Sequence, residues 1–189
     1  MGLARLDQLE QDFPLDVTYK SFYLRPDMPP EGIVRQPREG EQVGSPLTGH
    51  LGEVAEEAGL VMRRAPLTPN TRLAFEASEF AKDAGLFEPF HRECYRAFWE
   101  DGANLGELAV LQQIGKQVGL DPAAMEERLA AGHYTPAAQS QYEEALSIGV
   151  RGIPSFIIGR YFFSGAQPYD LFKRVADMAQ KEEAGEGEG

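Results

Sequence analysis

The 189-residue sequence predicts an α/β fold whose chain is interrupted by a long helical block. Three observations support this prediction: a helix-like segment runs directly into a strand-like segment at the start, helix signals dominate from residue 45 to about residue 149, and two strand-like runs precede a helix near the end. Helices and strands in direct succession are typical of α/β layers. We therefore expect residues 1–44 and 150–181 to form one α/β domain and residues 45–149 to form a helical insertion.

The N-terminal segment carries apolar residues at three- and four-residue spacing, which predicts an amphipathic helix over residues 4–12 that ends before Pro14. Residues 15–24 alternate around Val17, Tyr19 and Phe22 and are rich in β-branched and aromatic side chains, so they predict a strand. Prolines and glycines are frequent in residues 25–44, which predicts an irregular connection. The apolar residues of the helix are Leu3, Leu6, Leu9 and Phe13.

The block from residue 45 onward is punctuated by helix start and stop signals. An oxygen-bearing side chain before a proline predicts a helix start, because the oxygen caps free N–H groups and proline fits the first helical position. This pattern occurs at Ser45-Pro46, Thr68-Pro69, Asp121-Pro122 and Thr135-Pro136. Asn104 with Glu107 predicts a capping box. Glycines that favour helix C-termini stand at Gly59, Gly85, Gly102, Gly119, Gly132 and Gly149. The block thus predicts roughly six helices, with one extended stretch at residues 61–65.

After Gly149 the strand signal returns in residues 155–159 and 161–164, separated by a glycine-containing turn, which predicts a hairpin. Pro168 then opens a last helix with one apolar face. Residues 182–189 combine like charges with glycines, so we expect an acidic flexible tail.

The composition of the chain argues against several classes of function. The formal net charge of −12 opposes binding to nucleic acid. No uncharged apolar run approaches the roughly 18 residues of a membrane span, and the charged N-terminus does not resemble a signal peptide, so a cytoplasmic location is expected. Cys94 is the only cysteine, which excludes an internal disulfide and any cysteine-only metal site. We expect no cofactor and no metal.

The last third of the sequence carries a specific resemblance. Residues 147–158 read SIGVRGIPSFII and residues 163–168 read FSGAQP, and together they resemble the signature of the DsbA family. Residues 22–27, which read FYLRPD, with Glu31-Gly32, resemble a segment of the FrnE-like members. Pro69-Asn70-Thr71 and residues 90–121 are similar to the helical insertion of those members. The resemblance implies a thioredoxin-like fold with a large all-helical insertion.

The resemblance also implies a binding loop. On the sequence alone the Ile153-Pro154 bond is expected to be trans, since cis costs about 0.5–1 kcal/mol even before proline. The resemblance to thioredoxin folds reverses this expectation to cis, in a loop where Ile153 exposes backbone groups that can pair with an extended substrate. The substrate-binding residues implied are Gly152, Ile153, Pro154, Arg151, Phe22 and Asn70.

Two of these residues keep a second interpretation. Arg151 attracts an acidic substrate group or is an exposed loop arginine. Asn70 caps the helix that follows, which we favour, or faces a pocket as in glutathione-using relatives.

The family's redox dithiol is missing from the sequence. In the family a first strand leads into a Cys-Pro-x-Cys motif, and residues 1–6 resemble the residues just beyond its second cysteine. Without that strand, the fold is expected to be N-terminally truncated, with unpaired strand edges. Three explanations stay open: a translation start placed too late, a true truncation that closes its sheet in another way, or an unstable product.

Other candidate residues have ordinary structural interpretations. Cys94 with His91 one helical turn before it has the proximity of a nucleophilic pair, but a lone helix cysteine is more often a small buried hydrophobe. His50, His91 and His133 lie far apart and predict no metal site. The aromatic side chains of residues 87–99 are expected to pack in the core.

Three functions follow, in order of preference. The first is a DsbA-family thiol–disulfide oxidoreductase that is redox-inactive in this chain because the dithiol is missing. The second is a glutathione-dependent isomerase or transferase of the 2-hydroxychromene-2-carboxylate isomerase type. The third is a non-catalytic, thioredoxin-like peptide-binding module. The expected partner is a thiol- or disulfide-containing protein or peptide, or glutathione; a nucleic-acid or membrane partner is not expected, and an oligomer is left open.

Overall fold

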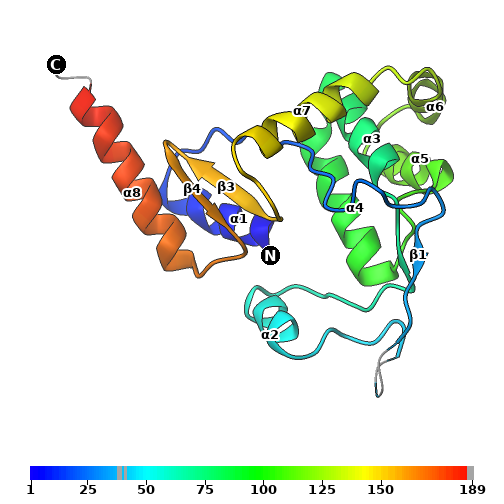
Figure 1. Ribbon diagram of the computed structural model, residues 1–189, viewed down its shortest axis with the longest axis horizontal. Coiled ribbons are helices and arrows are strands. Elements are labelled where there is room, and N and C mark those ends of the chain that lie inside the picture. Colours follow the sequence, from blue (N-terminus) through cyan, green and yellow to red (C-terminus); the bar gives the residue numbers. More distant parts are fainter. Residues whose placement is uncertain (38–39, 41, 187–189) are drawn as a thin grey trace. The chain divides into compact units, whose positions relative to one another are not determined.

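The computed structural model describes residues 1–37, 40 and 42–186 (Figure 1). They form two compact units, one from residues 1–19 and 145–189 and the other from residues 20–144. The expected division after residues 44 and 149 therefore differs from the observed one, because residues 20–37 pack with the helices. The elements are α1 (Gly2–Asp12), β1 (Ile33–Val34), α2 (His50–Glu57), β2 (Leu67–Thr68), α3 (Arg72–Asp83), α4 (Phe87–Asp101), α5 (Leu108–Gln117), α6 (Pro122–Ala130), α7 (Thr135–Ser147), β3 (Ser155–Ile158), β4 (Tyr161–Ser164) and α8 (Tyr169–Glu186).

The first unit consists of α1, the β3–β4 hairpin and α8. Its core is an aromatic cluster in which the ring of Phe172 stands edge-on to the rings of Phe156 and Phe163, at 4.7 and 4.9 Å between centroids. Leu9 of α1 is buried in the same cluster. At its surface, Asp12 of α1 accepts hydrogen bonds from Tyr169 and Lys173 of α8, both at 2.7 Å. The apolar stripes predicted for the first and last helices therefore meet across one face of the hairpin.

The β3–β4 hairpin confirms the prediction for residues 155–164. The two strands are antiparallel, with Ser155 opposite Ser164 and Ile158 opposite Tyr161. Side chains alternate between faces along each strand. Phe156 and Phe163 lie on the face that packs against the helices, while Ile157 is exposed. The hairpin thus has one covered face and one open face.

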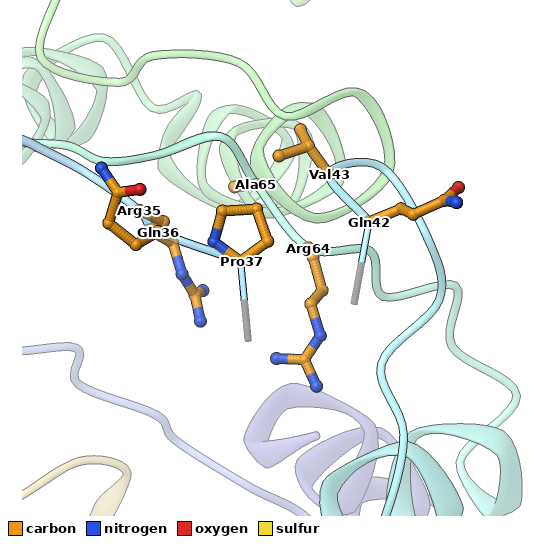
Figure 2. Close-up of a pocket in the computed structure, with 7 residues that line it drawn as sticks. All are labelled: Arg35, Gln36, Pro37, Gln42, Val43, Arg64 and Ala65. Atoms are coloured by element: carbon orange, nitrogen blue, oxygen red, sulfur yellow. The ribbon is translucent and has the colours of Figure 1, made fainter. Parts of the chain in front are cut away.

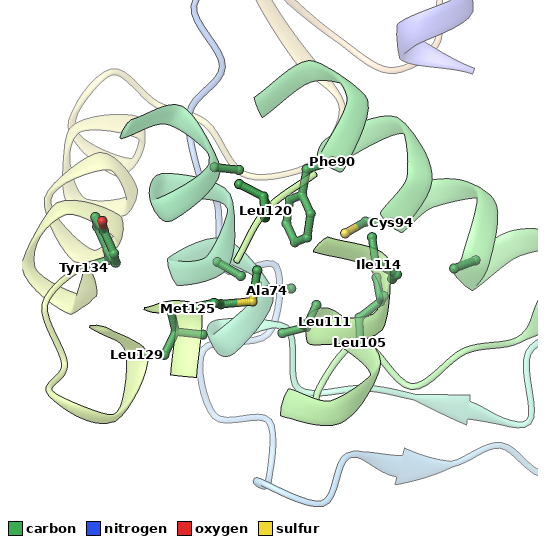
Figure 3. Close-up of a cluster of buried hydrophobic side chains, with 13 residues drawn as sticks. Ala74, Phe90, Cys94, Leu105, Leu111, Ile114, Leu120, Met125, Leu129 and Tyr134 are labelled. Atoms are coloured by element: carbon green, nitrogen blue, oxygen red, sulfur yellow. The ribbon is translucent and has the colours of Figure 1, made fainter. Parts of the chain in front are cut away.

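The second unit is helical and is held by a core to which α3, α4, α5 and α6 contribute (Figure 3). Phe90, Leu111 and Met125 are fully buried there. Small residues on α3, Ala77 and Ala81, are also fully buried, so neighbouring helices can approach α3 closely. The expected core position of the aromatic helix residues is confirmed for Phe90, whereas Tyr95 remains exposed.

The helix stop signals were more reliable than the start signals. All six glycines predicted to end helices have positive φ and follow the last turns of α2 to α7. Among the starts, Asp121 caps α6 as predicted: its Oδ1 atom accepts from the N–H groups of Ala123 and Ala124 at 2.9 and 3.2 Å. The helix predicted from Thr135-Pro136 is also confirmed, since α7 begins at Thr135.

Two predicted starts at proline are wrong because backbone pairing takes their place. Leu47 donates to Met62 at 2.9 Å, so residues 44–47 pair with the extended stretch at residues 62–64, and α2 begins only at His50. Thr68 belongs to β2, which pairs with β1, and α3 begins at Arg72. The β1–β2 pair was not predicted, since two-residue strands carry too little pattern to detect.

The predicted capping box is also wrong. Asn104 donates from Nδ2 to Glu107 at 2.8 Å, and its Oδ1 atom accepts from the N–H of Gly106 at 3.1 Å. The helix α5 starts afterwards, at Leu108. The two side chains therefore close a turn instead of capping a helix.

The strand predicted over residues 15–24 does not form. Ser21 and Tyr23 are buried against helices, and the backbone N–H of Ser21 donates to the side chain of Gln141 at 2.7 Å. The ring of Tyr23 contacts those of Phe75 and Tyr142 at 5.4 and 5.0 Å between centroids. The segment is strand-like in composition because it is apolar, yet it uses its apolar side chains to pack on α3 and α7.

The flexible tail predicted from residue 182 is wrong for residues 182–186, which continue α8. Glu182 accepts hydrogen bonds from Tyr161 and, at 2.6 Å, from Arg160, so the hairpin turn holds this part of the helix. Residues 187–189 lie outside the described residues. None of the helices in the described part of the chain has the length and apolar character required to cross a membrane.

Candidate functional site

The loop that precedes β3 gathers four of the six predicted site residues, Arg151 to Pro154. The peptide bond between Ile153 and Pro154 is cis. Ser155 donates from Oγ to the carbonyl of Gly152 at 2.7 Å, and Gly165 donates from its backbone N–H to the carbonyl of Pro154 at 2.8 Å. The loop is therefore held from within and by Gly165, which directly follows the end of β4. The side chain of Ile153 nevertheless remains 52% exposed.

The start of α1 lies directly against this loop. A Cβ atom added to Gly2 would stand 3.3 Å from Pro154 Cβ and 3.3 Å from Phe156 Cζ, which is tighter than ordinary contact. The first N–H groups of a helix have no partner within the helix, and the helix dipole makes this end positive. The arrangement places an exposed loop backbone beside a helix N-terminus. Sequence reasoning missed Gly2, for which only its position in the first turn was a signal.

The backbone of Ile153 is available for pairing. Ile153 lies in the loop before β3, which begins at Ser155, and takes no part in the β3–β4 ladder. Among the hydrogen bonds of the described residues, none uses the N–H or C=O group of Ile153. An exposed residue with both groups unpaired can form strand-like hydrogen bonds with an extended chain.

Arg151 is turned back toward its own chain. Its Nη1 atom donates to the carbonyls of Leu146 and Val150 at 3.2 and 2.9 Å. These carbonyls lie at and just beyond the C-terminus of α7, where a positive side chain is favourable. Arg151 thus has a structural role that suits an exposed loop arginine. Part of its guanidinium is already bonded to backbone carbonyls of its own chain.

Phe22 and Asn70 belong to the helical unit. The ring of Phe22 contacts that of Tyr142 at 5.4 Å between centroids. Asn70 donates from Nδ2 to the carbonyl of Met28 at 2.8 Å, and its Oδ1 atom accepts from the N–H of Arg72 at 3.0 Å. Both ends of the Asn70 amide are therefore engaged by backbone, at the start of α3 and along the preceding segment.

The pKa shifts of Cys94 and His91 are opposite to those that a nucleophilic pair requires. Burial, with a smaller effect from Glu93, raises the pKa of the Cys94 thiol to about 12. Burial, followed by the charges of Arg92 and Lys82, lowers the pKa of His91 to about 4. An activated cysteine needs a lowered thiol pKa and a base ready to accept its proton. Cys94 is thus a buried core residue, and the interpretation as a small hydrophobe is favoured.

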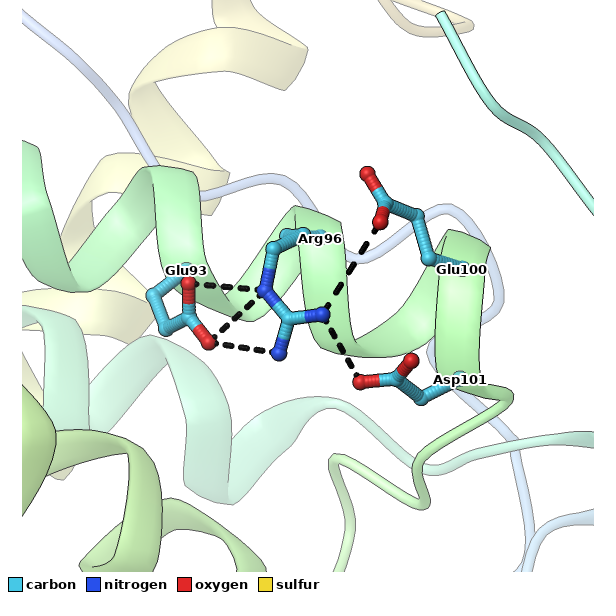
Figure 4. A network of polar contacts seen from close by, with 4 residues as sticks. All are labelled: Glu93, Arg96, Glu100 and Asp101. Atoms are coloured by element: carbon cyan, nitrogen blue, oxygen red, sulfur yellow. Dashed lines mark hydrogen bonds and ion pairs between the residues drawn. The ribbon is translucent and has the colours of Figure 1, made fainter.

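Two other features of the helical unit do not form a site for a large ligand. A small pocket beside Arg35 and Arg64 has a volume of only about 10 Å³, close to the space of one water molecule (Figure 2). Arg96 of α4 forms ion pairs with Glu93 at 2.7 Å and Asp101 at 2.9 Å, with Glu100 at 3.9 Å (Figure 4). This network lies on the surface, where such pairs contribute little. In the described part of the chain, no three potential ligands among His, Cys, Asp and Glu are grouped to hold a metal.

Comparisons with known proteins agree on a fold. Residues 1–176 match the family described as the DSBA-like thioredoxin domain. The protein YwbO of Bacillus subtilis (strain 168), described as uncharacterized, is 26% identical over 192 residues, which cover 96% of this chain and 90% of YwbO.

Two solved structures are similar as well. A probable DsbA oxidoreductase from Streptomyces coelicolor superposes with a TM-score of 0.78 at 23% identity, over 96% of this chain and 84% of that protein. A 2-hydroxychromene-2-carboxylate isomerase superposes with a TM-score of 0.63 at 18% identity, over 98% of this chain and 91% of that protein. At these identities the two structures show a shared fold and nothing further.

Proposed function

The chain belongs to the DSBA-like thioredoxin domain family, and from this membership we propose that it serves thiol–disulfide chemistry on polypeptide substrates by binding an extended substrate segment at Arg151 to Pro154. The observation that carries the proposal is the loop itself. Ile153 is half exposed, its backbone groups are unpaired among the described residues, and the N-terminus of α1 lies beside it. Strand-like pairing gives affinity through backbone bonds and leaves the substrate sequence free.

The proposal assigns binding, and no electron transfer, to these 189 residues. Thiol–disulfide exchange begins when a thiolate attacks a substrate disulfide and forms a mixed disulfide. Cys94 is the one thiol in the sequence, and its buried, protonated state makes it a poor nucleophile. Any thiol that reacts with a bound substrate is therefore separate from Cys94.

A glutathione-dependent isomerase is the alternative, as the similarity to a 2-hydroxychromene-2-carboxylate isomerase suggests. Recognition of glutathione needs polar side chains that are free to bind the tripeptide. The amide of Asn70 is already engaged at both ends by backbone, and Arg151 is bonded to its own chain. These contacts favour the polypeptide substrate over glutathione.

Binding of a reduced and alkylated insulin B chain, labelled with fluorescein and followed by fluorescence anisotropy, tests the proposal. We expect Ile153→Asp to weaken binding by about ten-fold or more, because its carboxylate would lose contact with water beside the bound segment at the centre of the site. Val61→Asp is the matched control, since Val61 is 51% exposed and lies in the helical unit. It should leave binding unchanged.

The same experiment can contradict the proposal. Equal affinities for the two variants would show that the loop is not the binding site. Saturable binding of reduced glutathione without binding of the B chain would favour the isomerase. An insulin-reduction assay should show no turnover above buffer, and turnover that is lost in Cys94→Ala would refute the role given to that thiol.

A further inference from the structure

The helix α2 of the helical unit is only weakly packed. Of its eight residues, Ala55 alone is buried. Short helices are marginal in water by themselves and gain most of their stability from tertiary packing. Leu51, one turn before Ala55, is nevertheless 49% exposed. Part of the apolar surface of α2 is therefore open to solvent.

The outward face of α2 is acidic. Glu53 and Glu57 are exposed, and their spacing of four residues places them on one face, opposite Ala55. Like charges at this spacing repel each other, and Glu57 lies in the last turn, where the helix dipole also disfavours a negative side chain. That turn holds no basic residue. No ion pair of the described residues uses either carboxylate of this acidic face.

A basic surface lies where the segment that carries α2 joins the β1–β2 pair. Arg63 and Arg64 precede β2, and Arg35 follows β1 and donates its backbone N–H to the carbonyl of Pro66 at 2.9 Å. Arg35 and Arg64 line one small hollow together with the exposed side chain of Val43 (Figure 2). Three positive side chains and an exposed apolar one are thus gathered in a chain whose net charge is −12.

We propose that two copies of this chain associate through a two-fold contact, in which the acidic face of α2 in each copy lies against the basic surface of the other. Leu51 and Val43 lie within the contact and lose their exposure to water. A two-fold contact makes each interaction twice, so a surface that carries both signs of charge is self-complementary. The contact lies in the helical unit and is separate from the binding loop, which belongs to the first unit.

The net charge of each copy does not prevent this contact. A charge of −12 on each copy opposes association at long range. At physiological ionic strength, however, interactions between exposed charges more than about 8 Å apart are largely screened. The oppositely charged side chains within the contact are closer than this, so their attraction persists.

An exchange of charges tests the pairing. One variant carries Glu53→Arg with Glu57→Arg, and the other carries Arg35→Glu with Arg63→Glu. In sedimentation equilibrium we expect the wild-type chain to dimerise with a Kd of about 1–100 μM, as small interfaces do. Each variant alone should dimerise about ten-fold more weakly or less, because like charges then face each other. An equimolar mixture should recover most of the wild-type affinity, because each α2 then meets arginines or glutamates of opposite charge.

A substitution at the apolar part of the contact is the second test. Leu51→Asp should weaken the dimer about ten-fold or more, because its carboxylate would lose contact with water in the interface. Leu24→Asp is the matched control, since Leu24 is 55% exposed and lies in the same helical unit, outside the proposed contact. It should leave the Kd of the dimer unchanged.

A third measurement uses the wild-type chain alone and does not depend on how the variants fold. In hydrogen exchange, raising the protein concentration from below to above the Kd should increase the protection of the α2 amides, since the dimer favours the folded helix. The amides of α6, which contributes to the buried core of the helical unit, should keep the same protection at both concentrations.

Each other outcome overturns the inference. A wild-type chain that stays monomeric up to about 1 mM does not make the contact. A dimer that survives in both charge-exchanged variants, or a mixture that fails to recover the affinity lost by each, would exclude pairing of α2 with the arginines. Equal effects of Leu51→Asp and Leu24→Asp, or dimerisation without a change in α2 protection, would assign the dimer to a different surface.

Discussion

At the scale of the residue, surroundings decide what Cys94 and Ile153 can do. Cys94 lies on α4 with its side chain in the helical core, where desolvation disfavours the thiolate. Ile153 is an apolar residue that the loop keeps half exposed, and its backbone groups form no hydrogen bond with the described residues. Cys94, which carries a thiol, is therefore buried, whereas Ile153, which has no reactive group, is available to a ligand.

The first prediction concerns the reactivity of Cys94. With a thiol pKa of about 12, the thiolate fraction stays below about 1% up to pH 9. We expect an aromatic disulfide reagent to leave the native chain essentially unmodified between pH 7 and pH 9 and to react fully after unfolding in guanidinium. A chain with Cys94→Ala and Glu56→Cys, which moves the thiol to the exposed surface of α2, should react at once. Fast reaction of native Cys94 would contradict its assignment to the core.

At the scale of the element, the ends of helices and strands depend on single side chains or on pairing. The helix α6 begins where the side chain of Asp121 accepts hydrogen bonds from two backbone N–H groups. At residues 44–47 the backbone pairs with a neighbouring extended segment instead, so no helix begins at that predicted start. Glycine predicts the end of a helix more reliably than a capping side chain predicts its start, because few other residues tolerate positive φ. At Gly32, with φ of 76°, a Cβ atom would also stand 2.6 Å from the carbonyl of Thr68, so the β1–β2 contact requires this residue.

The second prediction tests the cap of α6. Asp121→Ala removes the acceptor of two N–H groups, so we expect the free energy of unfolding to fall by about 1 kcal/mol. Asp121→Asn keeps a capping oxygen and should retain most of the stability. Chemical denaturation followed by circular dichroism measures both. A loss as large for asparagine as for alanine would mean that charge, and not capping, is the contribution of Asp121.

At the scale of the whole molecule, the chain builds two cores from interleaved segments. Residues from both ends of the sequence form the first unit, around Phe172, and the middle of the sequence forms the second, around Phe90. The proposed binding loop, residues 151–154, belongs wholly to the first unit. Its position therefore depends on the aromatic cluster beneath the hairpin that follows it.

The third prediction separates the two cores. Phe172→Ala removes a fully buried ring, so we expect it to cost about 3–5 kcal/mol. In hydrogen exchange, protection should fall in α1, the β3–β4 hairpin and α8, while α3 to α6 keep theirs. Phe162→Ala, at a half-exposed position in the same hairpin, is the control and should change stability far less. Uniform loss of protection in Phe172→Ala would show that the two units unfold as one.

Much of the fold follows from local signals in the sequence. Periodic apolar residues predicted α1, α8 and the β3–β4 hairpin, and glycines marked the ends of α2 to α7. The resemblance of residues 147–168 to the DsbA family identified the family that the comparisons confirm. These features depend on residues close together in the chain, so they can be read without knowing how distant segments meet.

Tertiary structure decided the rest, because it concerns segments distant in sequence. Residues 15–24 carry a strand-like composition, but packing on α3 and α7 uses their apolar side chains without forming a β-ladder. Asn70 has two available interpretations in the sequence, and only the nearby carbonyl of Met28 shows which groups its amide contacts. The contact of Gly2 with Pro154 joins opposite ends of the chain. The sequence by itself determined most helices, the β3–β4 hairpin and the family, whereas long-range packing determined the β1–β2 pair, the place of residues 15–24 and which side chains and backbone groups remain open to a partner.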